Sequence, residues 1–198
     1  MTARIVYVHG FNSSPASAKA RVLRERLEAI GRGAEFLCPA LPHLPSEASR
    51  LLEGAVAGIA PDELTLLGSS LGGYYATWIA ERTGCRAVLV NPAVRPWELF
   101  QSTLGPQKNL YTGEEYLLTP RHIEELWALE VEPITRPERY LLLAATGDEV
   151  VDWRRAVEKY RGAVQVVVQG GDHGFSGFAD YLELILDFAA LSEKQKPA

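Results

Sequence analysis

The sequence has few cysteines and no long apolar run, and each absence narrows the class of protein. Cys38 and Cys85 are its two cysteines and form no C-x-x-C pair, so we expect free buried thiols in a reducing cytoplasm rather than a disulfide scaffold. No apolar run approaches the roughly 18 residues of a membrane-spanning helix, so membrane insertion is not expected. A strand-like run begins at residue 4, which leaves no room for a signal peptide and favours a cytoplasmic location.

Motifs for nucleic acids, cofactors and metals are also missing. The net charge is −5 and the basic residues are scattered, so no nucleic-acid partner is expected. The glycine-rich turn at 68–73 lacks the following Lys-Ser/Thr of a Walker A loop, and no G-x-G-x-x-G follows the first strand-like run. His9, His43, His122 and His173 show no metal-ligand spacing. The sequence therefore predicts neither a cofactor nor a metal.

What the sequence does contain is a regular alternation of short apolar runs and helix-forming segments. The strand-like runs are 4–9, 34–38, 64–67, 86–90, 140–145 and 164–168. Helical spacing is found at 16–30, 46–59 with Ser46 as its N-cap, after the third run to about 83, at 153–160 and at 181–191. The pattern predicts one α/β domain over residues 1–198, a three-layer sandwich with a mostly parallel six-stranded sheet.

Residues 97–137 break this rhythm. They contain two amphipathic pieces, 97–104 and 120–129, joined by a polar, turn-rich link at 105–115. We interpret the segment as a small helical excursion, similar to a lid, over the carboxyl edge of the sheet. Ligands bind at that edge in open α/β sheets.

The centre of the sequence is the stretch 64–78, in which an apolar run meets the turn Gly68-Ser-Ser70-Leu-Gly72 and then a helix. This is the strand–turn–helix pattern of a nucleophile elbow, G-x-S-x-G, which exposes the serine hydroxyl at the end of a strand and the start of a helix. Because the pentapeptide also occurs by chance, a glycine-rich turn with a capping serine is the alternative.

A serine nucleophile needs a base and an orienting carboxylate, in the chain order Ser, acid, His. Ser70 is followed by Asp148 after the fifth strand and by His173 after the sixth, so these three form the predicted catalytic set. Asp152 and Asp172 are the rival acids, in that order.

The remaining site predictions concern the loops around Ser70. The backbone N–H groups of Leu71 and Phe11 are expected to form an oxyanion hole, while His9 is expected to bond loop backbone rather than act in catalysis. Asn12 either caps the first helix or lines the pocket. Arg95 either binds a carboxylate or phosphate of the substrate or pairs with Glu98 or an acid of the excursion, and pairing is favoured.

Several segments give the sequence a family resemblance. They are 7–15 (YVHGFNSSP), 68–78 (GSSLGGYYATW), 91–96 (NPAVRP), 111–113 (YTG), 146–150 (TGDEV) and 170–173 (GGDH). With these motifs the chain resembles the YqiA/YcfP family of small bacterial α/β-hydrolase-fold esterases. The resemblance implies hydrolysis of carboxylic esters, with acyl-CoA thioesters as a further class, in the bacterial cytoplasm. It also supports Ser70, Asp148 and His173 as the catalytic residues.

Together these features favour a serine hydrolase that cleaves small-molecule esters or acyl thioesters through an acyl-enzyme on Ser70. The alternative is a non-catalytic binding protein that keeps the hydrolase scaffold, because a fold does not by itself imply a function. A third hypothesis keeps the catalytic set for another reaction, such as hydrolysis of a carbon–carbon bond.

Overall fold

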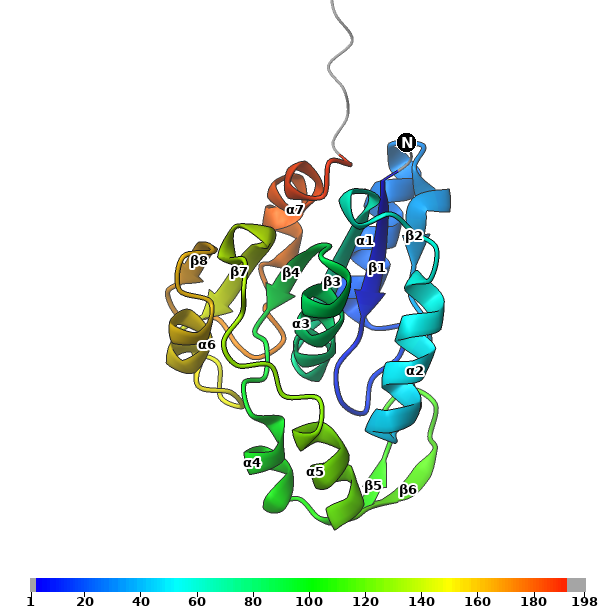
Figure 1. The fold of residues 1–198 in the computed structure, drawn as a ribbon, viewed down its shortest axis with the longest axis vertical. Helices are drawn as coiled ribbons and strands as arrows, with labels where there is room; N and C mark the ends of the chain where they lie inside the picture. Colours follow the sequence, from blue (N-terminus) through cyan, green and yellow to red (C-terminus); the bar gives the residue numbers. More distant parts are fainter. Residues whose placement is uncertain (1–2, 192–198) are drawn as a thin grey trace, which may run out of the picture.

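A parallel sheet of six strands organises the structure, a computed structural model that describes residues 3–191 (Figure 1). The strands are β1 (Arg4–Val8), β2 (Phe36–Leu37), β3 (Leu64–Ser69), β4 (Arg86–Val90), β7 (Tyr140–Ala145) and β8 (Val164–Val168). They lie in the order β2-β1-β3-β4-β7-β8, and every neighbouring pair is parallel. The predicted sheet is confirmed. Strands β3 and β7 are buried along their whole length, which explains their mainly apolar sequences.

Helices cover both faces of the sheet. They are α1 (Ala18–Ala29) and α7 (Leu182–Phe188) on one face, and α2 (Pro45–Val56), α3 (Leu71–Thr83) and α6 (Trp153–Lys159) on the other. Strand β1 shows how one sequence serves both layers, because successive side chains of a strand point to opposite faces. Ile5 and Tyr7 pack in the core with α1 and α7, whereas Val6 and Val8 pack with α2 and α3. The predicted three-layer sandwich is therefore confirmed.

Several predicted boundaries were wrong. Helix α2 begins at Pro45 with Leu44 as its N-cap, so Ser46 lies inside the helix. Proline suits the first helical position, where its missing N–H has no partner to lose. The N–H of Ser46 instead donates to Glu125 at 3.0 Å. The second strand is only two residues long because residues Gly33–Glu35 form a 3-10 turn before it.

The excursion contains a β-hairpin that the sequence analysis missed. The excursion consists of α4 (Pro96–Gln101), β5 (Gly105–Lys108), β6 (Glu115–Leu118) and α5 (Pro120–Trp127). Strands β5 and β6 pair antiparallel and form the hairpin. The predicted polar link at 105–115 is therefore mostly strand and hairpin turn. In Figure 1 the strand arrows of the main sheet point toward this excursion, so it lies beyond the carboxyl edge as expected.

The hairpin is stabilised by the loop after β1, which explains why its own sequence gives so weak a signal. Tyr116 donates its hydroxyl to Asn12 Oδ1 at 2.8 Å. The N–H of Leu110 donates to the Asn12 carbonyl at 3.3 Å, and Asn109 Nδ2 donates to the Ser13 carbonyl at 3.0 Å. These partners are about a hundred residues apart in the sequence, so periodicity within the hairpin does not reveal them.

Two further observations concern membrane-spanning helices and the cysteines. No helix between residues 3 and 191 has the length and apolar character needed to cross a bilayer. Cys85 is buried and Cys38 is half-buried, and both are free thiols. Burial raises the pKa of the Cys38 thiol to about 12, so this thiol is held protonated.

Candidate active site

Ser70 lies at a sharp turn between β3 and α3. Its backbone has φ 56°, a left-handed conformation that costs energy for any residue with a side chain and that the surroundings must impose. The N–H of Ser70 donates to the Val90 carbonyl of β4 at 3.0 Å. A Cβ at Gly68 would collide with the backbone of Gly72, and a Cβ at Gly72 would collide with β1. The two flanking glycines are therefore required by close backbone approach.

Ser70, His173 and Asp148 form a continuous chain of hydrogen bonds. His173 Nε2 lies 2.9 Å from Ser70 Oγ, and His173 Nδ1 lies 2.8 Å from Asp148 Oδ2. The Asp148 side chain is fully buried and that of His173 is 20% exposed. The structure thus brings together three predicted residues that come from the loops after β3, β7 and β8. A buried carboxylate at Nδ1 leaves Nε2 free to take a proton from the serine hydroxyl.

Asp148 is held by its own loop as well as by His173. Its Oδ1 accepts the N–H groups of Val150 at 2.8 Å and Val151 at 2.9 Å. The two rival acids have other partners. Asp152 is the N-cap of α6 and accepts the N–H of Arg154 at 3.0 Å, while Asp172 bonds Ser176. Among these three acids, it is therefore Asp148 that bonds the imidazole.

Two residues that support His173 were not predicted. Asn91 Nδ2 donates to the carbonyls of Asp172 at 2.9 Å and His173 at 3.1 Å, and its Oδ1 accepts the N–H of Ala145 at 2.9 Å. The N–H of His173 donates to Glu149 at 3.0 Å. The sequence feature that could have identified Asn91 is its position directly after β4, which neighbours β7 in the sheet. Asn91 thus ties the end of β7 to the histidine loop.

The loop after β1 passes directly beside Ser70. A Cβ added to Gly10 would lie 3.6 Å from Ser70 Oγ, so the backbone of this loop is within reach of a group bound to the serine. Phe11 lines the same depression as Ser70, and Leu71 opens α3 immediately after it. The structure therefore places both predicted oxyanion residues around Ser70. The Phe11 ring packs against Phe100 of α4, with ring centroids 4.6 Å apart.

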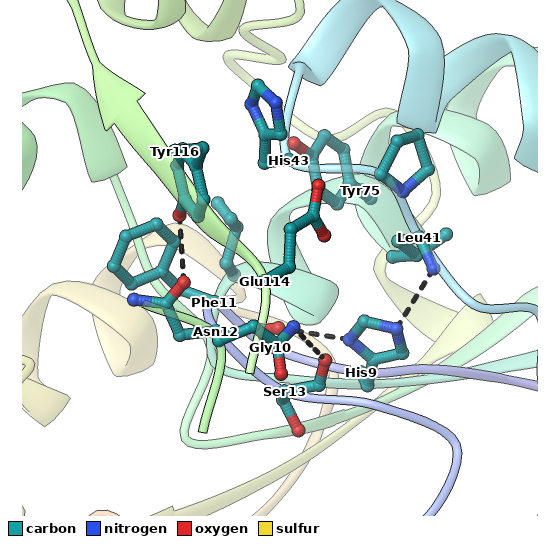
Figure 2. Close-up of a pocket in the computed structure, with 13 residues that line it drawn as sticks. His9, Gly10, Phe11, Asn12, Ser13, Leu41, His43, Tyr75, Glu114 and Tyr116 are labelled. Carbon is teal, nitrogen blue, oxygen red and sulfur yellow. Dashed lines mark hydrogen bonds between the residues drawn. The ribbon is translucent and has the colours of Figure 1, made fainter. Parts of the chain in front are cut away.

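His9 has the structural role that was predicted. Its Nε2 accepts the N–H of Leu41 at 3.0 Å, and its Nδ1 lies 3.0 Å from the Gly10 carbonyl (Figure 2). Burial lowers the pKa of His9, which favours the neutral ring that these two bonds require. His9 therefore fixes the loop that carries Gly10 and Phe11.

Asn12 and Arg95 were the candidate substrate-binding residues, each with a structural alternative, and the structure gives both of them partners within the protein. Asn12 lines the small cavity in Figure 2, but its amide is engaged by Tyr116 and by Gln107 at 3.3 Å, and so holds the hairpin. Arg95 pairs with Glu132 at 3.3 Å and Glu98 at 3.8 Å. It lines depressions beside α6 rather than the one beside Ser70. The favoured pairing of Arg95 is confirmed, whereas contact of Asn12 or Arg95 with a substrate stays a prediction.

Ser70 and His173 face a depression of about 260 Å³. Its walls include the backbone at Gly10 and Phe11, Lys19 of α1 and Tyr111 of the hairpin turn. A second, small cavity of about 30 Å³ shares Gly10, Phe11 and Ser13 with this depression and is the one in Figure 2. Within residues 3–191, no group of three or more His, Cys, Asp or Glu side chains is arranged to hold a metal ion. The chemistry that this geometry offers is nucleophilic attack by serine.

Comparisons with known proteins agree with this architecture. The UPF0227 protein of Serratia proteamaculans (strain 568) is 26% identical over 191 residues, which span 94% of this chain and 99% of that protein. Among solved structures, the chain is similar to mouse alpha/beta hydrolase domain-containing protein 10, with a TM-score of 0.73, 17% identity and coverage of 97% and 92% of the two chains. It is also similar to the esterase domain of a Rhodothermus marinus protein, with a TM-score of 0.64, 18% identity and coverage of 94% and 86%.

These structural likenesses establish the α/β-hydrolase fold. The family model described as "Uncharacterised protein family (UPF0227)" matches residues 4–190, nearly the whole chain. That family is the YqiA/YcfP family, so the resemblance seen in the sequence motifs is confirmed, and the chain belongs to it.

Proposed function

We propose that this protein is a serine hydrolase that cleaves carboxylic esters or acyl thioesters through an acyl-enzyme on Ser70. The observation that carries the proposal is the chain of hydrogen bonds from buried Asp148 through His173 to Ser70 Oγ, with heavy-atom distances of 2.8 and 2.9 Å. One of the similar structures is named an esterase domain, which supports the same reaction class.

The roles follow from the positions of the atoms. His173 Nε2 takes the Ser70 proton as Oγ attacks the acyl carbonyl, and the resulting imidazolium donates that proton to the leaving alcohol or thiol. Asp148, buried against Nδ1, holds the ring in the required tautomer and stabilises its positive charge. Water then attacks the acyl-enzyme by the same route, with His173 acting as the base again.

The negative charge that develops on the acyl oxygen needs donors that are already in position. We assign them to the backbone N–H groups of Leu71, at the start of α3, and of Phe11, in the loop beside Ser70. The macrodipole of α3 places partial positive charge at the same point. This loop is held in place by the hydrogen bond between His9 and Leu41 and by the one between Asn12 and Tyr116 of the hairpin.

The test combines covalent labelling with a substrate panel. A fluorophosphonate probe should label the protein at Ser70, and the Ser70→Ala variant should remain unlabelled. With 4-nitrophenyl esters and acyl-CoAs of increasing chain length, Ser70→Ala should reduce kcat by roughly 10⁴- to 10⁶-fold. A folded wild-type protein that is not labelled and turns over no ester or thioester would instead support the non-catalytic binding protein.

A further inference from the structure

The depression in front of Ser70 contains a positive charge that the proposed reaction does not use. Lys19 lies in the first turn of α1 and lines the depression together with Ser70 and His173. Lys19 and Ser70 are 51 residues apart in the sequence, and the parallel order of β1 and β3 brings the two loops together.

The hydrogen bonding of Lys19 leaves it free to bind a second group. Its Nζ donates to the Gly174 carbonyl at 2.6 Å, and an ammonium has three donors. Among residues 3–191, no carboxylate forms an ion pair with it, although Asp172 and Asp148 are near enough to favour its charge. Two donors are therefore left for water or for a ligand in the depression.

The charge of Lys19 is not matched by an ion pair within residues 3–191, although Asp172 and Asp148 lie near it. Burial lowers the pKa of Lys19, and the two aspartates only partly oppose this effect. Helix α1 begins at the same wall of the depression, with no acidic residue in its first turn and no side-chain cap at Ser17. An anion placed here would meet both a partly buried ammonium and the positive end of a 12-residue helix.

The position of Lys19 also indicates which part of a substrate it faces. His173 passes its proton to the leaving group, so the leaving group departs on the side where His173 stands. Lys19 is bonded to the carbonyl of Gly174, the next residue after that histidine. Lys19 is therefore on the leaving-group side of Ser70.

From these observations we infer that Lys19 binds an anionic substituent on the leaving group, so that the preferred substrates are esters or thioesters of acidic alcohols or thiols. The inference rests on the proposed function, because it assigns a substrate class to the same site. Lys19 becomes a specificity-determining residue, and its bond to Gly174 keeps the ammonium in place.

The experiment compares matched esters. The anionic probe is 3-carboxy-4-nitrophenyl butyrate, the neutral probe is 4-nitrophenyl butyrate, and mono(4-nitrophenyl) succinate places the carboxylate on the acyl side. Lys19→Met should lower kcat/KM for the anionic leaving group about tenfold, the equivalent of 1.4 kcal/mol, mainly through KM. The other two esters should change by less than about twofold, and Lys19→Arg should retain the preference.

The outcomes separate this inference from the proposed function. Equal losses for all three esters in Lys19→Met would overturn it and leave Lys19 as a support for the histidine loop. An unchanged rate for the anionic ester would overturn it as well, while ester turnover by itself keeps the proposed function. Binding of the anionic ester to Ser70→Ala, measured by calorimetry, provides a readout without turnover. Binding that depends on Lys19 supports the anion site even if no ester is cleaved, and binding that does not depend on Lys19 overturns it.

Discussion

Asn91 combines a strained backbone with three hydrogen bonds, two of them to the histidine loop and one to the end of β7. It has φ 42° and joins β7 to the carbonyls of Asp172 and His173. Replacing it with Ala removes the bonds, and replacing it with Gly removes the bonds while relieving the backbone. We predict that both variants lower kcat by roughly 100-fold with little change in KM, because small displacements of a catalytic group are costly.

The rate of fluorophosphonate labelling and steady-state ester kinetics test this prediction. Asn91→Gly is the informative variant, because a backbone effect alone would leave it active. Near wild-type kcat in a folded Asn91→Gly protein would contradict the role assigned to the side chain.

Among individual residues, the sequence predicted the members of the proposed catalytic set better than the residues that position them. Ser70, Asp148 and His173 followed from chain order and strand ends, because the reaction restricts both. Asn91, Glu149 and Lys19 did not, since their partners Asp172, His173 and Gly174 lie 24 to 155 residues away in the sequence. Such pairs become visible only when the loops meet at the sheet edge.

Among the elements, the excursion makes a titratable contact with the loop before α2. His43, in the loop before α2, places Nδ1 3.0 Å from Nε2 of His122 on α5. His122 Nδ1 accepts the N–H of Thr119 at 3.2 Å, which caps α5. The ring of His43 also stacks on Tyr116 of β6, with centroids 4.2 Å apart. Because His122 Nδ1 must accept, its Nε2 must donate, and both rings are required to be neutral.

This contact predicts that the excursion loosens in acid. Burial and then the neighbouring His43 lower the pKa of His122 below its ordinary 6.5, and Arg121 adds to the effect while Glu125 opposes it. A folded pKa below the unfolded value means that the unfolded segment binds the proton more readily. The stabilisation that this contact gives the excursion is therefore fully present above about pH 6.5, and it decreases as the pH falls.

Hydrogen exchange followed by mass spectrometry tests this prediction. At pH 5 the peptides of α5 and β6 should show faster opening than at pH 8, after correction for intrinsic rates. Strand β3, which has no titratable side chain, should show no such difference and serves as the internal control. Equal protection of α5 at the two pH values would contradict the prediction.

For the molecule as a whole, Glu81 is an anchor at the end of the sheet opposite the site. It accepts Thr135 Oγ1 at 2.6 Å, Tyr140 Oη at 2.5 Å and Arg139 Nη2 at 3.3 Å. Burial by itself raises the pKa of Glu81, but these bonds and the N–H of Thr135 outweigh it and the pKa is lowered. Because the pKa of Glu81 is lower in the folded than in the unfolded protein, its ionised carboxylate stabilises the fold above the unfolded pKa of about 4.5. This stabilisation is lost as the pH falls through the folded pKa.

We predict that Glu81→Gln reduces the free energy of unfolding by about 1.5–3 kcal/mol at pH 7, the range for hydrogen bonds to a charged group. The loss should be smaller at pH 3, where the wild-type carboxylate takes up a proton. Urea denaturation at both pH values measures it. Glu53→Gln is the matched control, because its exposed pair with Arg82 at 3.2 Å should contribute less than about 1 kcal/mol. A loss that is equal at both pH values would count against the ionised Glu81.

The architecture was predictable for a physical reason. The four inner strands β1, β3, β4 and β7 are covered on both faces, so burial selects an apolar run that the sequence displays directly. The hairpin of the excursion has one weak strand, Gly105–Lys108, and depends on Asn12 and Ser13 from a distant loop. The position of the excursion in the chain was predicted, and the hairpin within it was not.

The attachment of the hairpin to the loop after β1 has a consequence for turnover. A flap that must swing open makes product escape slow and sensitive to solvent viscosity. Here three hydrogen bonds tie the hairpin to Asn12 and Ser13, in the loop that borders the depression beside Ser70. If the proposed reaction holds, we expect substrates to be selected by whether they fit an entrance of fixed width, and turnover to begin without a lag phase.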